Sequence, residues 1–161
     1  MNYHDTIEKF FEVTSTKYII GWQENEVPDF PIMHLLKKNK DDEKYSVAIV
    51  PLTVPGGLPK EISPMELVKP IIKEFTPDAY IVFSEAWTVD INKVDKSFKN
   101  LKHGDLEYMK NRKEKLFIVG RSMDDKQHFQ KIFLITRDHR TMKKSLSLEN
   151  PLRKLVSSKF P

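Results

Sequence analysis

The 161-residue chain contains no cysteine and only five glycines. Without a thiol there is no disulfide, no thiolate nucleophile and no zinc site built on cysteine. No apolar run approaches the ~18 residues that a membrane-spanning helix requires, so we expect no membrane segment. The first residues, MNYHDTIEKFF, lack the basic end and apolar core of a secretory signal. We therefore expect a single soluble domain in the cytoplasm.

Motifs of several enzyme classes are also missing. The sequence has no G-x-S-x-G turn of serine hydrolases, and the pair Gly56-Gly57 lacks the Lys-Ser/Thr ending of a phosphate-binding loop. The five histidines are scattered, without the i, i+4 spacing of a helical zinc site, so no metal and no other cofactor is expected. A nuclease-type metal core would need a lysine two residues after Glu85, where this chain has Trp87.

The spacing of apolar residues predicts two principal helices. One covers about residues 5–16, and the short run 18–22 fits either its last turn or a strand. The other begins after Ser63, whose hydroxyl can cap the first turn while Pro64 occupies a position that needs no amide hydrogen. Pro70 lies inside this second helix and is expected to kink or split it.

Five strands are expected, at 31–38, 45–52, 78–89, 116–122 and 130–137. Four of them form two hairpins, and strands do not alternate with helices. This order predicts an α+β domain with a mainly antiparallel sheet of about five strands. The domain is expected to span 1–138, with a basic C-terminal extension over 139–161 in which 151–160 is a candidate helix.

One carboxylate stands in the most apolar strand, AYIVFSEAWTVD. Alternation places Glu85 on the bulkier apolar face, together with Trp87. Because an unpaired buried charge costs several kcal/mol, Glu85 must be paired, protonated or near an edge open to water. Arg121 is the first choice of partner, ahead of Lys131 and Arg137, since a guanidinium can donate two parallel hydrogen bonds to a carboxylate. Glu85 is then a member of a structural ion pair, or lines a ligand or catalytic pocket with Trp87 as its apolar wall, or is fully exposed to solvent.

Four short stretches follow one another between residues 78 and 138: SEAW at 84–87, NRKE at 111–114, LFIVGRS at 116–122 and TRD at 136–138. Together they resemble a group of uncharacterised small proteins of microbial and phage genomes. The resemblance implies Glu85, Trp87, Arg112 and Glu114 as shared positions, and it implies no activity. With Arg121, these residues form the candidate site. The long connection 90–115 is interpreted as a lid over that site or as a solvated excursion with a short helix near 106–112.

The positive charge is concentrated at the C-terminus. From Arg137 onward, seven lysines and arginines stand against two acids, a charge of +5 in a chain of net charge +4. The remainder of the chain is therefore close to −1. A basic tail on a near-neutral domain is typical of binding to phosphate backbones. The candidate nucleic-acid-binding residues are Arg137, Arg140, Lys143 and Lys144.

Three functions are consistent with the sequence. The leading hypothesis is a non-catalytic binding or interaction module, because no recognisable set of catalytic residues assembles. The first alternative is a nucleic-acid-associated protein that binds through the basic tail. The second is an enzyme with Glu85 in a loop-covered pocket. The partner is a nucleic acid or another protein, and the sequence leaves the oligomeric state open.

Overall fold

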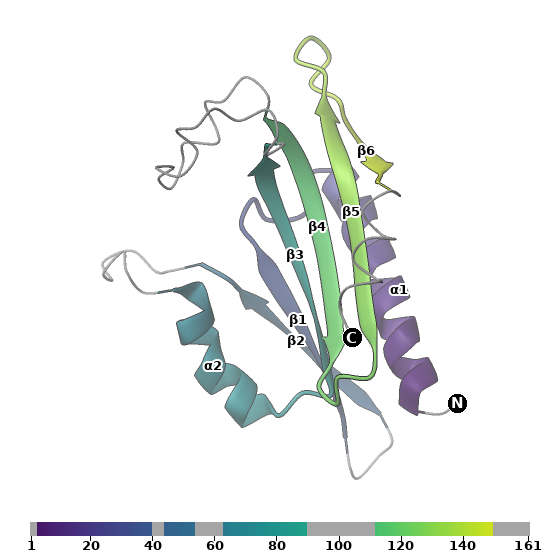
Figure 1. Cartoon of the computed structure of the whole chain (residues 1–161), viewed down its shortest axis with the longest axis vertical. Helices are drawn as coiled ribbons and strands as arrows, with labels where there is room; N and C mark the ends of the chain where they lie inside the picture. Colours follow the sequence, from purple (N-terminus) through teal and green to yellow (C-terminus); the bar gives the residue numbers. More distant parts are fainter. Residues whose placement is uncertain (1–2, 40–43, 54–62, 90–111, 150–161) are drawn as a thin grey trace. The chain divides into compact units, whose positions relative to one another are not determined.

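The computed structural model describes residues 3–39, 44–53, 63–89 and 112–149. These residues form two helices and a six-stranded antiparallel sheet with the strand order β2-β1-β3-β4-β5-β6 (Figure 1). The elements are α1 Tyr3–Gln23, β1 Ile32–Lys38, β2 Tyr45–Pro51, α2 Pro64–Phe75, β3 Ala79–Thr88, β4 Lys113–Ser122, β5 His128–Arg137 and β6 Lys144–Leu148. The predicted α+β class and antiparallel sheet are confirmed, with one strand more than the five expected.

The chain divides into two compact units. The first unit comprises residues 1–84 and 118–130, and the second unit comprises residues 85–117 and 131–161. Strands β3, β4 and β5 each contribute residues to both units. Within the first unit lie both helices and the β1–β2 hairpin, whose antiparallel pairing was predicted and is confirmed.

Helix α2 covers one face of the sheet in the first unit. Val68 of α2 is buried in a cluster with Met33 and Leu35 of β1 and Val50 of β2. The helix starts as predicted, with the Ser63 hydroxyl accepting a hydrogen bond from the amide of Met65 at 3.3 Å. Burial of one apolar stripe holds such a short helix on the sheet.

The expected splitting of α2 at Pro70 is not observed. Pro70 lies inside the helix and is exposed, and the helix is not split there but continues to Phe75. An exposed proline keeps its ring and its missing hydrogen bond on the solvent side, so the packed stripe is undisturbed.

Helix α1 covers the opposite face of the same unit. Its buried stripe includes Phe11, Tyr18 and Trp22, at helical spacing. The Tyr18 ring stacks on Phe83 of β3 with 4.0 Å between centroids, and Phe11 lies 5.5 Å from Phe129 of β5. The residues 18–22, which fitted either a strand or a last helical turn, are helical. Neither helix of the described residues is long and apolar enough to cross a membrane.

The second unit contains a strand that the sequence did not predict. Residues 144–148 form β6, which pairs with β5 in the register Phe133↔Leu148 to Arg137↔Lys144. Part of the expected C-terminal extension is therefore one strand of a hairpin. The connection 90–115, interpreted as a lid or a solvated excursion, lies outside the described residues up to residue 111, and its residues 113–115 belong to β4. The short helix expected near 106–112 lies outside them except for residue 112, and so does the candidate helix at 151–160.

A close approach between α1 and β4 requires glycine at position 120. A methyl group there would lie 2.9 Å from two ring carbons of Phe11 and 3.3 Å from the carbonyl oxygen of Tyr80. We expect Gly120→Ala to lower the free energy of unfolding by about 1–3 kcal/mol, because Phe11 is buried and the added atom overpacks the core. Urea denaturation measures the change. Gly21→Ala is the comparison variant, because its methyl group would lie 3.1 Å from one side-chain carbon of Val27 and not against a buried ring. The gain of about 0.5–1 kcal/mol in stability that alanine brings over glycine in a helix opposes that contact; equal losses of stability in both variants would contradict the argument.

His34 couples stability to pH. It is half-buried in β1 with its ring 5.4 Å from that of Phe83, and burial lowers its pKa from the usual 6.5. The unfolded chain therefore takes up a proton at a higher pH than the folded chain does, so stability is lost as the pH falls through about 6.5. Denaturation at pH 7.5 and 5.5 should show a smaller pH-dependent loss for His34→Gln than for the wild type. An identical loss in both proteins would show that other groups cause it.

Candidate functional site

One guanidinium lies between two carboxylates in the second unit. Arg137 donates from Nε to Glu114 Oε1 at 2.9 Å, and its Nη2 donates to the same oxygen. The same Nη2 atom lies 3.7 Å from Glu85 Oε2. The side chains of Glu114, Glu85 and Arg137 are 15%, 27% and 42% exposed. A partly buried carboxylate is held more firmly by such charge-assisted bonds than a surface carboxylate would be.

The sheet brings these three residues together. Glu85, Glu114 and Arg137 lie on β3, β4 and β5, which are neighbours in the strand order. The end of β3 meets the beginning of β4, where the Thr88 hydroxyl donates to the carbonyl of Lys113 at 3.2 Å. Because cross-strand neighbours share a face, long side chains from adjacent strands can reach one another there.

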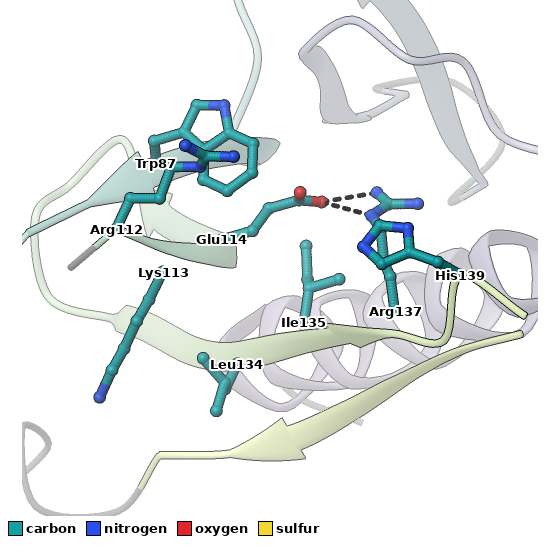
Figure 2. A pocket seen from close by; sticks show the side chains of 8 residues that line it. All are labelled: Trp87, Arg112, Lys113, Glu114, Leu134, Ile135, Arg137 and His139. Carbon is teal, nitrogen blue, oxygen red and sulfur yellow. Dashed lines mark hydrogen bonds and ion pairs between the residues drawn. The ribbon is translucent and has the colours of Figure 1, made fainter. Parts of the chain in front are cut away.

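The second element of the site is a cation–π pair. The Arg112 guanidinium lies over the indole ring of Trp87, 4.8 Å from its centroid. An arginine stacked on tryptophan is held by the ring quadrupole and by dispersion. The pair therefore presents a flat, cationic surface next to the Glu114–Arg137 ion pair, as Figure 2 shows.

These groups line one pocket of about 470 Å³. Six of its side chains point to the same side of the strands in Figure 2: Trp87, Arg112, Glu114, Ile135, Arg137 and His139. Lys113 and Leu134 also line the pocket, but their side chains point to the other side of the sheet. Ile135 is buried and gives the pocket an apolar floor, while Arg112, Arg137 and His139 are exposed. The volume is in the range of about 300–1,000 Å³ of small-molecule sites.

Glu114 keeps one oxygen available. Both hydrogen bonds from Arg137 reach Oε1, and within residues 3–39, 44–53, 63–89 and 112–149 none reaches Oε2. A carboxylate is an acceptor only, so this oxygen is suited to a ligand that carries an N–H or O–H donor.

The turn after β5 is held by Asp138. Its carboxylate accepts hydrogen bonds from the amides of Arg140 at 2.9 Å and Thr141 at 3.4 Å, and its amide donates to the Lys143 carbonyl at 2.8 Å. The two amide donors lower the pKa of Asp138 below its usual value. This closed turn fixes the backbone that carries Arg140 and Lys143, both of which are exposed.

Four of the five predicted site residues lie together. Trp87, Arg112 and Glu114 line the pocket, and Glu85 contacts it through Arg137. Arg121 was the wrong choice as the partner of Glu85, because it pairs with Asp125 at 2.5 Å in the β4–β5 turn. The end of β4 that carries Arg121 lies next to the beginning of β3, where the Met123 amide donates to the Asp78 carbonyl at 2.8 Å.

The predicted nucleic-acid-binding residues also lie at one place. Arg137 is the last residue of β5, Lys144 is its register partner on β6, and Arg140 and Lys143 are in the turn between them. The prediction placed them on an extension, whereas they form one end of a hairpin. His139, which the sequence analysis assigned to no site, lines the pocket. Its position after a strand-ending arginine was the sequence signal available for it.

Comparison of the chain with protein-family models, curated proteins and solved structures found no match. The resemblance to small microbial and phage proteins therefore stays a prediction. The function is argued from the geometry of the pocket and the charges around it.

Arg137 should be the arginine on which the site depends for stability. We expect Arg137→Gln to lower the free energy of unfolding by about 1–3 kcal/mol, because two partly buried carboxylates lose the cation between them. Arg121→Gln is the matched control. Its ion pair is 47% and 64% exposed and should change stability by less than about 0.5 kcal/mol.

Thermal and urea denaturation of both variants test this difference. Adding Glu114→Gln to Arg137→Gln should restore part of the loss, because one of the two uncompensated charges is then removed. A loss in Arg121→Gln equal to that in Arg137→Gln would contradict the assignment.

Proposed function

We propose that this protein is a non-catalytic binding module that binds nucleic acid through its second unit. The observation that carries the proposal is the charge of that unit. Its described residues contain eight lysines and arginines against four acids, a charge of +4, whereas those of the first unit contain nine against eleven, a charge of −2. The eight cations are Arg112, Lys113, Lys115, Lys131, Arg137, Arg140, Lys143 and Lys144.

Not all of these cations are equally available. Lys115 pairs with Glu149 at 2.9 Å, and Arg137 is held by two carboxylates. Arg140 and Lys143 are exposed in the β5–β6 turn, and Lys144 follows them at the start of β6. We name Arg140, Lys143 and Lys144 the hairpin cations. A phosphate backbone is attracted to such a cluster, because each neutralised phosphate releases a condensed counterion.

The hairpin cations adjoin the pocket through Arg137 and His139. A ligand bound there would meet cations at the turn and a tryptophan with an isoleucine floor in the pocket. A polyanion with flat apolar groups combines both properties, and nucleic acid is such a polymer. An acidic peptide would match the cations but would offer no flat ring to stack on the Arg112–Trp87 pair.

No observation in the described residues favours the enzyme alternative. Glu85 is not among the residues that line the pocket, and it faces Arg137, which cannot exchange protons at neutral pH. A cytoplasmic binding protein therefore remains the function we propose.

The proposal is tested by titrating fluorescent single-stranded RNA and DNA with the full chain at about 50 and 200 mM salt. We expect affinity to fall steeply with salt, and Arg140→Gln/Lys143→Gln to weaken binding by about tenfold and to reduce the salt slope by roughly one per lost phosphate contact. Lys17→Gln/Lys69→Gln removes two exposed cations from the helices of the first unit and should change affinity by less than twofold.

Substitutions are used because truncation after Thr136 would remove β6 as well as charge. If neither RNA nor DNA binds at the lower salt concentration, the proposed function is wrong. If both double variants weaken binding equally, the charge excess of the second unit is not the cause.

A further inference from the structure

We propose that the pocket holds one unpaired nucleobase that carries an exocyclic amino group, so that the protein selects single strands and discriminates cytosine from uracil. This inference rests on the proposed function, and it names the part of the nucleic acid that enters the pocket. It is carried by two features of the pocket: the Arg112–Trp87 pair with the buried Ile135, and the available oxygen of Glu114.

The first feature selects a flat ring. The Arg112 guanidinium lies 4.8 Å from the Trp87 ring centroid, and both side chains point to the side of the strands where the pocket lies, as Figure 2 shows. Bases that are splayed out of a strand stack on aromatic rings and on arginine planes. The apolar Ile135, which lines the same pocket, adds contact area without adding a hydrogen-bonding group.

The second feature selects a donor. Glu114 Oε1 accepts two hydrogen bonds from Arg137, so the ion pair fixes the orientation of the carboxylate and leaves Oε2 for the ligand. A carboxylate accepts from the amino group of cytosine, whereas uracil presents a carbonyl oxygen at the same position and would be repelled. A partly buried acceptor of this kind discriminates strongly, because the wrong base leaves two acceptors facing one another.

The same two features exclude duplexes. In a double helix the amino groups and the faces of the bases are occupied by pairing and stacking, and one base would have to be extruded to enter the pocket. The hairpin cations, at the rim next to Arg137 and His139, then hold the phosphates that flank the bound base. Phosphate contacts position the strand, and the pocket recognises the base.

The first experiment compares fluorescent oligo(C) with oligo(U) RNA of equal length, using the full chain. We expect oligo(C) to bind at least about fivefold more tightly than oligo(U), and more tightly than a duplex of the same length. Glu114→Gln should reduce the difference to less than twofold, because an amide offers both a donor and an acceptor. Trp87→Ala should weaken oligo(C) binding by about tenfold.

The second experiment does not depend on any variant being stable. The chain contains two tryptophans, and Trp22 is buried in the first unit. In NMR spectra of the ¹⁵N-labelled protein, oligo(C) should shift the indole signal of Trp87 and leave that of Trp22 unchanged. Trp87→Phe, which keeps an aromatic ring, identifies the signal and should retain most of the affinity.

The outcomes separate the two proposals. If both oligonucleotides bind equally, with salt dependence and an unmoved Trp87 signal, this inference is overturned while the proposed function stands. If neither binds at low salt, both are overturned. A fivefold preference for oligo(C) that persists unchanged in Glu114→Gln would overturn the role given to Glu114.

Discussion

The arrangement of the site depends on one guanidinium. Arg137 stands at the end of β5 between Glu114 and Glu85, which come from the two preceding strands of the sheet. Without it, two carboxylates would lie near one another in a partly buried place, where like charges repel strongly. The ion pairs therefore link the ends of three strands, and they fix the direction in which Glu114 presents its free oxygen. Removing Arg137 would alter the fold and the pocket together.

Alternation along β3 was enough to predict that Glu85 and Trp87 share a face and belong to one site. The sequence could not predict how β3 pairs with the later strands. About 24 residues separate β3 from β4, and a connection of that length allows β4 to run either parallel or antiparallel to β3. The hairpin of β4 and β5 contains both Arg121 and Arg137, and either arginine could have been the partner of Glu85. The antiparallel pairing brings the beginning of β4 and the end of β5 to Glu85, and this choice of direction decides between the two arginines.

The missed strand has a different cause. KSLSL is short and contains only two large apolar residues, so its own sequence predicts no strand. Its structure comes from the neighbouring turn, where Asp138 accepts hydrogen bonds from two amides and returns the chain beside β5. Tertiary pairing of this kind overrides weak local propensity. For the proposed function, the pairing of β6 means that the cations expected on a C-terminal extension are held at the end of a hairpin.

We assign different roles to the pocket and to the hairpin cations because carboxylates neutralise Arg137 in the pocket. Arg137 lies inside the pocket, but two carboxylates compensate it, so this arginine has little charge to offer a phosphate. In the exposed turn, the Asp138 carboxylate accepts hydrogen bonds from backbone amides, and Arg140 and Lys143 are exposed to water. On the proposed function, a polyanion is drawn to the turn, while the interior of the pocket selects neutral groups that carry hydrogen-bond donors. Glu85 and Glu114, which would weaken a purely electrostatic site, would then allow this one to discriminate among ligands.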